Sequence, residues 1–376
     1  MLAIQGPNDM RERTSKPASL EALTGIRFVA ASMVFLYHYG ASFAGRIGAP
    51  QPIVNILSRG YLGVSLFFIL SGFILTYSYM QRAQRTGWVY EFEVARFARI
   101  YPVYALALLI ALPLSAPNLT FGDALRVLSM TQAWTTPSSD LGYAWIMQAW
   151  TLSIELVFYL LFPFLIGRVC RMRLRSVVAS IAICWLVMFL FGTPSVTPYT
   201  PGFHSAVAEL SVSSPIPIPA WRLFEFVLGM LMCRLMVSSR VSLQKYSGLA
   251  PTLTIIGLIL FILAVGSGDR SLAIAMILTS VLLVLLALGD NAVVMALSSK
   301  VMVTLGGASY ALYLLQWPVR EYIRLLHRPA LEQILNPVVA LAVSLLVFHY
   351  WEGPLRIALI GAYRRLTRPA VEVRIT

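Results

Sequence analysis

The sequence predicts an all-α, polytopic integral membrane protein with about ten transmembrane helices, and its composition carries this prediction. Of the 376 residues, 58% are hydrophobic and only 12% are charged, whereas soluble domains carry about 25% charged residues. A soluble fold of this length cannot bury so much apolar surface, but lipid solvates apolar helix faces directly. Since a spanning helix needs about 20 apolar residues, the chain accommodates about ten spans.

Apolar stretches place the expected helices, with boundaries that carry an error of a few residues. The ranges are 22–43, 61–80, 101–115, 145–166, 177–191, 221–237, 251–266, 271–288, 301–319 and 336–352. No small-residue cleavage site follows the first of them, so we expect it to stay in the protein as the first helix. We therefore expect a cytoplasmic tail at 1–19, one transmembrane domain at 20–360 and a second cytoplasmic tail at 361–376.

The distribution of positive charge predicts that both termini are cytoplasmic. The net charge is +13, but the basic residues flank apolar stretches, which favours membrane topology over nucleic-acid binding. With the N-terminus inside, cytoplasmic segments hold 20 Lys and Arg residues and outer segments hold 8, as the positive-inside rule requires. The last outer connection, with Arg320, Arg324 and Arg328, goes against this bias; a helix boundary there is misplaced, or a short segment lies along the interface.

Two ionisable residues lie in the first expected helix, where a charge costs about 2.5–3.5 kcal/mol on insertion scales. Arg27 and His38 are eleven residues apart, which is about 16 Å of helix rise and a return to within about 20° of the same face. One helix face thus presents a cation near the cytoplasm and an imidazole near mid-depth. The alternative is that Arg27 snorkels to the interface and His38 only bridges two helices.

Paired arginines precede the third expected helix on its cytoplasmic side. Arg96 and Arg99 are three residues apart and share a helix face. Guanidinium groups offer planar forks of donors that suit phosphate. The alternative is ordinary flanking charge, with Glu93 as a local partner. No cluster of residues has the spacing of a metal site, and Cys170, Cys184 and Cys233 match no zinc or redox motif.

A carboxylate lies at mid-depth in the fourth expected helix. Glu155 is about ten residues into a segment that starts near Gln148. A buried carboxylate pairs with a cation or acts on a substrate, and His38 is the neighbour that we expect for it. The alternative is an ion pair of Glu155 with an arginine that only fixes helix packing.

Weaker signals come from three further segments. Arg222 and Glu225 are three residues apart and are typical of a local ion pair. The aromatic residues of segment 309–318 are typical of interfacial anchors, with Gln316 as its odd polar member. Glu352 is expected to form a salt bridge with Arg356.

Six fragments, in order along nearly the whole chain, resemble the membrane-bound acyltransferase family 3. These bacterial enzymes move acyl groups from a cytoplasmic donor onto extracytoplasmic glycans. The fragments are Leu23-Thr-Gly25-Ile-Arg27 with His38, Leu66-Phe-Phe-Ile-Leu-Ser71-Gly72-Phe73, Arg96-Phe-Ala-Arg99-Ile-Tyr-Pro102, Trp150-Thr-Leu-Ser153-Ile-Glu155 with Phe158-Tyr159, Gly306-Gly-Ala-Ser309-Tyr310 with Leu312-Tyr313, and Glu352-Gly-Pro354.

The resemblance implies an acyltransferase of the bacterial inner membrane that uses acyl-coenzyme A, with acetyl expected and succinyl open. It implies essential roles for Arg27 and His38 and donor binding by Arg96 and Arg99. His38 would act as general base or would accept the acyl group covalently, with Glu155 orienting the imidazole. Substrate contacts are expected from three residues, Ser153, Tyr310 and Gln316.

Gln316 departs from the family pattern, which usually has His at that position, and Gln cannot take up a proton. The acceptor is expected to be a glycan or a lipid-linked sugar, and neither its identity nor the oligomeric state follows from the sequence. A proton-coupled secondary transporter or exporter of a sugar or lipid is the alternative from another class. It would use the same mid-depth His and Glu, but the chain shows no internal repeat.

Overall fold

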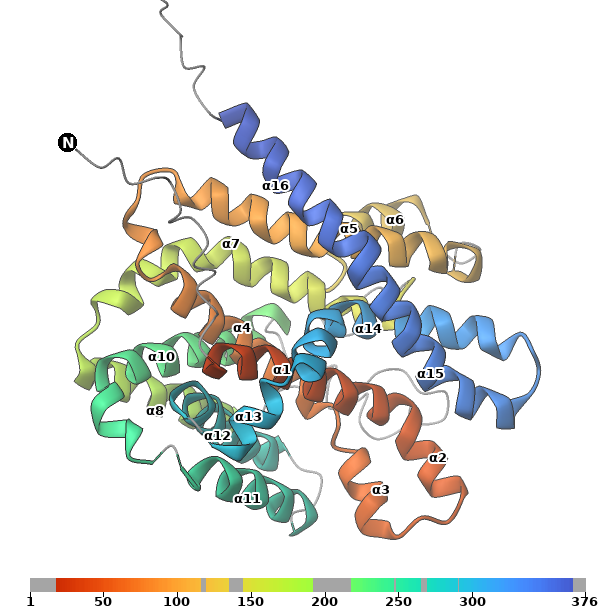
Figure 1. Ribbon diagram of the computed structural model, residues 1–376, viewed down its shortest axis with the longest axis horizontal. Helices are drawn as coiled ribbons and strands as arrows, with labels where there is room; N and C mark the ends of the chain where they lie inside the picture. The colour runs from red at the N-terminus through yellow and green to blue at the C-terminus, as the bar shows by residue number, and fades with distance from the viewer. Residues whose placement is uncertain are drawn as a thin grey trace, which may run out of the picture.

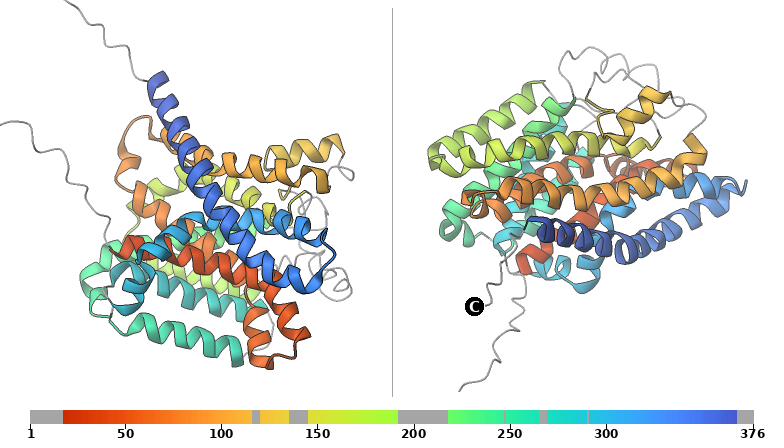
Figure 2. Two further views of the ribbon diagram at one scale, coloured as in Figure 1. Left: turned by 45° about the vertical axis from the view of Figure 1, so that its right-hand side comes forward. Right: turned by 90° about the horizontal axis from the view of Figure 1, so that it is seen from above.

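The computed structural model describes residues 18–115, 120–134, 145–191, 218–246, 248–264, 269–289 and 291–367, and these residues form helices with no strand among them. The longer helices are α1 (Ala18–Phe35), α4 (Leu62–Tyr79), α5 (Trp88–Ser115), α7 (Trp150–Arg171), α8 (Leu174–Phe191), α10 (Ile218–Gln244), α11 (Ala250–Ala264), α12 (Asp269–Leu288), α14 (Lys300–Arg324), α15 (Pro329–Val347) and α16 (Gly353–Thr367). Most of them run roughly along the longest axis of the molecule (Figure 2).

By length and composition, six helical stretches among the described residues can cross a membrane. They are Leu20–Arg46, Gln51–Tyr79, Trp88–Leu114, Met147–Arg171, Pro219–Gln244 and Leu331–Thr367. Shorter apolar helices occupy Leu174–Leu190, Ala250–Leu263 and Ala273–Leu288. The all-α prediction is therefore confirmed, while ten crossings and the orientation of the termini stay predictions.

Helix α1 lies in the middle of the bundle, next to α4 and α14 (Figure 1). A Cβ on Gly306 would lie 2.0 Å from the carbonyl oxygen of Thr24, and at the other end of the pair the Arg320 guanidinium lies 4.9 Å from the ring centre of Tyr39. Thr24 and Tyr39 follow each other along the first helix in the same order as their partners Gly306 and Arg320 along α14. The two helices therefore run parallel. The family-like fragment around Gly306 thus marks a close helix crossing.

Glycines also let α4 and α10 approach each other backbone to backbone. A Cβ on Gly72 would lie 2.0 Å from the carbonyl oxygen of Phe226, and one on Gly229 would lie 1.9 Å from that of Ile69. Membrane helices gain no hydrophobic driving force from lipid-to-protein transfer, so such close van der Waals packing holds them together.

Replacing Gly229 by alanine is therefore expected to separate α4 from α10 and to lower the thermal unfolding temperature in detergent. The added methyl group meets backbone, which has no rotamer by which to move away. Gly257 of α11 is the control, because a Cβ there has nothing within 4 Å. Fluorescence-detected melting of both variants measures the effect; equal melting temperatures for Gly229→Ala and wild type would contradict the packing.

All ten predicted ranges overlap helices among the described residues, but two boundaries were far off. Helix α5 begins at Trp88 instead of residue 101 and continues through Pro102, so Arg96 and Arg99 lie inside the helix. Pro102 lacks the N–H that would bond to the Ala98 carbonyl, a loss that membrane helices tolerate when neighbouring groups satisfy the freed backbone. The carbonyl of Pro102 itself accepts a hydrogen bond from the indole of Trp351 at 2.9 Å. The last predicted helix extends as α15, a π-helical turn at Phe348–Glu352 and α16.

Three short helices, at 51–57, 121–128 and 292–297, fell outside the predicted ranges because none of them is long enough to span a membrane. The first helix continues through a π-helical segment, Leu36–Gly40, into α2 (Ala41–Arg46), which packs on α3 (Gln51–Leu57). Helices α6 (Phe121–Leu128) and α13 (Ala292–Leu297) are also short, and a 3₁₀ turn, η5 (Met147–Ala149), leads into α7. Figure 1 shows α2, α3 and α6 at the end of the molecule where α14 turns into α15. The expected tails at 1–17 and 368–376 and the long connection at 192–217 lie outside the described residues.

Candidate functional site

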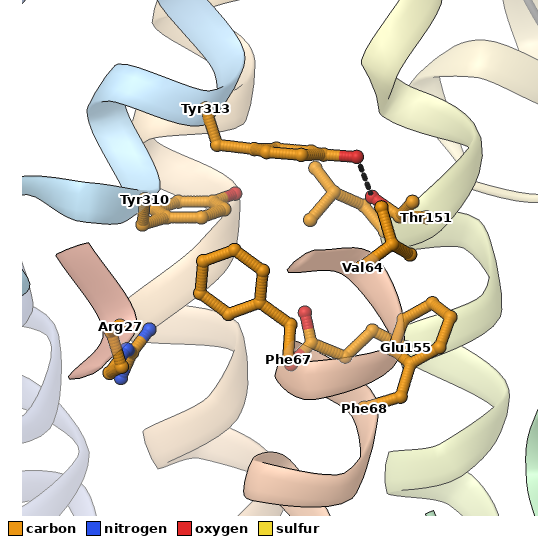
Figure 3. Close-up of a pocket in the computed structure, with 9 residues that line it drawn as sticks. Arg27, Val64, Phe67, Phe68, Thr151, Glu155, Tyr310 and Tyr313 are labelled. Atoms are coloured by element: carbon orange, nitrogen blue, oxygen red, sulfur yellow. Dashed lines mark hydrogen bonds between the residues drawn. The ribbon is translucent and has the colours of Figure 1, made fainter. Parts of the chain in front are cut away.

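A cavity of about 50 Å³ lies between α1, α4, α7 and α14, with room for roughly three or four waters. Its lining combines apolar side chains with an arginine, a carboxylate and hydroxyl groups: Arg27, Val64, Phe67, Phe68, Thr151, Leu152, Glu155, Tyr310 and Tyr313. Figure 3 shows these side chains converging from four helices, with Tyr313 meeting Thr151 across the top. The Thr151 hydroxyl donates to the Tyr313 hydroxyl at 3.1 Å.

Helix periodicity explains why Thr151 and Glu155 reach the same cavity. They are four residues apart and so share one face of α7. The Glu155 carboxylate accepts hydrogen bonds from the hydroxyl groups of Ser71 on α4 and Tyr159 on α7. Neither partner carries a positive charge, so the charge of Glu155 is free to act over a longer range on Arg27, with which it interacts electrostatically.

Arginines Arg27, Arg96 and Arg99 have no ion pair among the described residues. The buried Nε atoms of Arg27 and Arg96 also lack a hydrogen-bond partner there. Arg96 lies over aromatic rings instead, 5.7 Å from the ring centre of Phe92 and 5.9 Å from that of Tyr159. Arg99 and Arg27 interact electrostatically with each other. Arg27 and Arg96 therefore keep unused guanidinium donors.

Glu352 brings the end of α15 into the same region. It is 2% exposed and interacts with Arg99, Arg27 and Arg356, in that order of strength. The expected Glu352–Arg356 salt bridge is wrong: the ion pairs among the described residues do not include it, although the two groups interact electrostatically. We call Arg27, Arg96, Arg99, Arg356, Glu155 and Glu352 the inner charge cluster.

The inner charge cluster holds four arginines against two glutamates, and Glu93 also acts electrostatically on Arg96, so one positive charge is left in excess. Uncompensated charge in a low-dielectric interior is costly, and a paired anion removes much of that cost. Guanidinium groups with free donors form strong, bidentate hydrogen bonds with phosphate and carboxylate. The geometry therefore favours an anionic ligand that lies against the arginines and reaches toward the cavity.

His38 lies elsewhere, in the π-helical segment Leu36–Gly40. Its ring packs against the rings of Tyr37 and Tyr39, at 5.1 and 6.0 Å between centroids, and it interacts electrostatically with Arg320 of α14. The expected pairing of Glu155 with His38 is therefore wrong: Glu155 lies at the level of Arg27, and His38 lies near the opposite end of α14. Single-turn π-helices are frequent at functional sites.

Of the three predicted substrate contacts, Tyr310 lines the cavity. Its hydroxyl donates to the Ile100 carbonyl at 2.9 Å. Tyr310 and Tyr313 are buried at 8% and 6% exposure, so their assignment as interfacial anchors was wrong. Ser153 faces away from the cavity, since its hydroxyl accepts the backbone N–H of Ala133 at 3.1 Å. Gln316 is fully buried but lies one turn beyond the cavity.

The expected local ion pair of Arg222 and Glu225 is present and buried, with Ser65 of α4 bonded to both side chains. Thr151 and Tyr159 had no signal in the sequence beyond their place in the fourth fragment. No group of three metal-ligating side chains is close enough to hold a metal ion within the described residues.

A family model described as an acyltransferase domain matches residues 20–349. The chain belongs to this acyltransferase family. The resemblance drawn from the six fragments is thereby confirmed, and the protein is an acyltransferase enzyme of a membrane-bound type.

Curated relatives of this acyltransferase have matching names. "Acyltransferase MdmB" of Streptomyces mycarofaciens is 28% identical over 321 residues, which cover 81% of this chain and 79% of the relative. "O-acetyltransferase OatA" of Staphylococcus aureus is 27% identical over 191 residues, or 47% of this chain and 30% of that relative. "Protein 2 in picA locus" of Rhizobium radiobacter is 39% identical over 101 residues, 25% of this chain and 44% of the relative. No solved structure matches the chain.

Proposed function

We propose that this acyltransferase moves an acyl group, most simply acetyl, from acyl-coenzyme A to a hydroxyl group of an extracytoplasmic or lipid-linked glycan. One observation carries the proposal: the excess positive charge of the inner charge cluster, with unused guanidinium donors, lies beside a largely apolar cavity whose lining also includes Thr151 and Tyr313. Coenzyme A has the matching shape, with anionic phosphates on a bulky head and a thin, neutral arm that ends in the thioester.

In this proposal the phosphates lie against Arg96 and Arg99, and the pantetheine arm follows the first helix past Arg27. The name of the relative OatA, an O-acetyltransferase, supports acetyl as the group and a hydroxyl as the acceptor. With the N-terminus cytoplasmic, the arginines lie toward the cytoplasm, where acyl-coenzyme A is made. The rise of about 16 Å from Arg27 to His38 is comparable with the reach of that arm.

His38 would take the proton of the acceptor hydroxyl while the oxygen attacks the thioester carbonyl. The C–O bond then forms, the C–S bond breaks, and coenzyme A leaves as a thiolate that takes up a proton. A covalent acyl-histidine that is later attacked by the acceptor gives the same products. Incubating the purified protein with radiolabelled acetyl-coenzyme A and no acceptor distinguishes the two routes, since only the second retains label on protein.

The proposed function as a whole is tested by deleting the gene and comparing glycans of the deletion strain with those of its parent by mass spectrometry. Loss of acyl groups from one glycan, restored by the wild-type gene, is expected. Release of coenzyme A by membranes that contain the protein excludes a transporter, which would consume no thioester. Unchanged glycan acylation together with no coenzyme A release would reject the proposal.

Arg96→Gln and Arg99→Gln are each expected to raise the KM for acetyl-coenzyme A about fivefold to tenfold, because each removes one charge-assisted contact with phosphate. The KM for the acceptor should not change. Initial rates in proteoliposomes, followed by thiol release, measure both constants. Arg168→Gln is the matched control, since Arg168 is exposed near the cytoplasmic end of α7 and donates to the Phe164 carbonyl. A change confined to the acceptor constant would contradict the phosphate role.

A further inference from the structure

Three buried polar side chains lie beyond the cavity and have no role in donor binding. Tyr39, Gln148 and Gln316 are 9%, 1% and 0% exposed. The Tyr39 hydroxyl, both polar atoms of the Gln148 side chain and Oε1 of Gln316 lack a hydrogen-bond partner among the described residues. We call these three residues the amide cluster. Buried polar groups are nearly always bonded, so several orphaned groups in one place indicate an absent ligand.

The helices bring the amide cluster together one turn above the cavity. On α14, Gln316 lies between Tyr313 and Arg320 on one face, since the three are spaced by three and four residues. Opposite them lies Gln148, which belongs to η5, a turn that packs on α14. The carbonyl of Gln148 accepts a hydrogen bond from the Thr151 hydroxyl. Because Thr151 is bonded to Tyr313, Gln148 lies near the level of Gln316.

Tyr39 completes the arrangement from the first helix. Its hydroxyl lies next to the Gln148 amide, without a hydrogen bond of ordinary geometry between them. Its ring lies under the Arg320 guanidinium, with 4.9 Å to the ring centre. His38 precedes Tyr39 in the chain and interacts with the same arginine. The amide cluster therefore lies beside the imidazole.

The charges around the amide cluster cancel, unlike those of the inner charge cluster. Arg320 donates to the Glu332 carboxylate of α15 at 2.8 Å, so this pair leaves no net charge for an ionic ligand. Side-chain amides and phenols can both donate and accept hydrogen bonds. Sugar hydroxyl groups have the same double capacity, which makes a neutral polyol the complementary ligand.

We propose that Tyr39, Gln148 and Gln316 form the acceptor subsite and hold the hydroxyl groups of an uncharged sugar next to His38. This inference rests on the proposed function and adds the acceptor's chemical class: a neutral glycan or glycolipid, selected against acidic ones. An acidic sugar would place its carboxylate among groups that include no unpaired cation within the described residues, and would lose its hydration without compensation.

The test uses wild-type protein in proteoliposomes, radiolabelled acetyl-coenzyme A and a total glycan and glycolipid extract of the source membranes as acceptor. After the reaction, anion exchange separates neutral from acidic products. Label in the neutral fraction is expected. Label mainly in the acidic fraction overturns the inference while the proposed function stands, whereas no label in any fraction and no coenzyme A release means that the proposed function itself has failed.

Gln148→Met and Gln316→Met keep the side-chain volume and remove the amide. Each is expected to raise the extract concentration for half-maximal rate about tenfold, because a buried hydrogen bond to the substrate is lost and its partner stays unpaired. The KM for acetyl-coenzyme A should be unchanged, a split that general misfolding would not produce. An unchanged acceptor constant in both variants overturns the inference.

Gln132→Met is the matched control. Gln132 is 1% exposed and is bonded in the same way as Gln316: its amide nitrogen donates to a backbone carbonyl, that of Ala149 at 3.2 Å, and its Oε1 has no partner among the described residues. It differs in place, since its amide also contacts the Tyr104 hydroxyl of α5 at 3.5 Å and is not part of the amide cluster. Gln132→Met is expected to lose some stability without any change in the extract concentration for half-maximal rate. A rise of the acceptor constant in Gln132→Met equal to that of the two test variants would assign the effect to packing and overturn the inference.

Discussion

Replacing His38 by alanine is expected to lower acyl transfer at least about a hundredfold while leaving the protein folded in membranes. General base catalysis contributes about 10² to 10⁴ in rate, and the His38 imidazole lies beside the amide cluster on the first helix. The KM for acetyl-coenzyme A should change little, because His38 lies about three helical turns from Arg27 and the rest of the inner charge cluster. Rates with saturating donor and acceptor measure the effect.

His349 supplies an unusually close control for His38. It also lies in a five-residue π-helical segment, Phe348–Glu352, with a neighbouring tyrosine ring at 4.9 Å, yet it is exposed. His349→Ala is expected to retain wild-type transfer. If His38→Ala kept more than a tenth of the wild-type rate, the imidazole would not be the base, and both the direct and the covalent route through it would be excluded.

Replacing Arg27 by glutamine is expected to have the second-largest effect, because Arg27 alone of the cluster arginines lines the cavity. Its guanidinium has no ion pair among the described residues and an orphaned Nε, so its donors are available to a ligand. Loss of a charged hydrogen bond costs about 1.5–3 kcal/mol, which corresponds to a weakening of donor binding by roughly ten- to a hundredfold. Titration calorimetry with coenzyme A measures this directly.

Arg27→Lys separates charge from geometry at the same position. Lysine restores the positive charge beside Glu155 but not the planar fork of donors, so it is expected to recover only part of the affinity. Full recovery would indicate that Arg27 acts as a point charge. Unchanged coenzyme A affinity in Arg27→Gln would remove Arg27 from the donor site and leave it as a packing residue.

Helix positions followed from hydropathy because lipid imposes a length and an apolar composition on every span. Short elements such as α6 and α13 escape that rule. That Arg27, Arg96 and Glu155 face the interior of the bundle could be predicted, since charges at membrane depth must do so. Which partners they meet depends on how the helices rotate and shift, and no local property of the sequence sets this.

The pairing of Glu155 with His38 failed for that reason. Both residues seemed to lie at mid-depth when counted from predicted helix ends, but the parallel contacts of the first helix with α14 place His38 near Arg320 and Arg27 nearer the start of α14. Ser153 failed for a simpler reason. It lies two residues from both Thr151 and Glu155 on α7, a rotation of about 200°, so it cannot share their face.

The hydrogen bond between Tyr313 and Thr151 also bears on how well the membrane keeps its proton gradient. An enzyme that joins a polar donor chamber to a polar acceptor site through a bilayer risks a continuous file of water, along which protons would leak. The Phe67 ring packs edge-on against the Tyr313 ring at 6.1 Å between centroids, beside the hydrogen bond to Thr151, and we expect this apolar contact to interrupt such a file. While idle, the protein can thus remain in an energised membrane without dissipating its proton gradient.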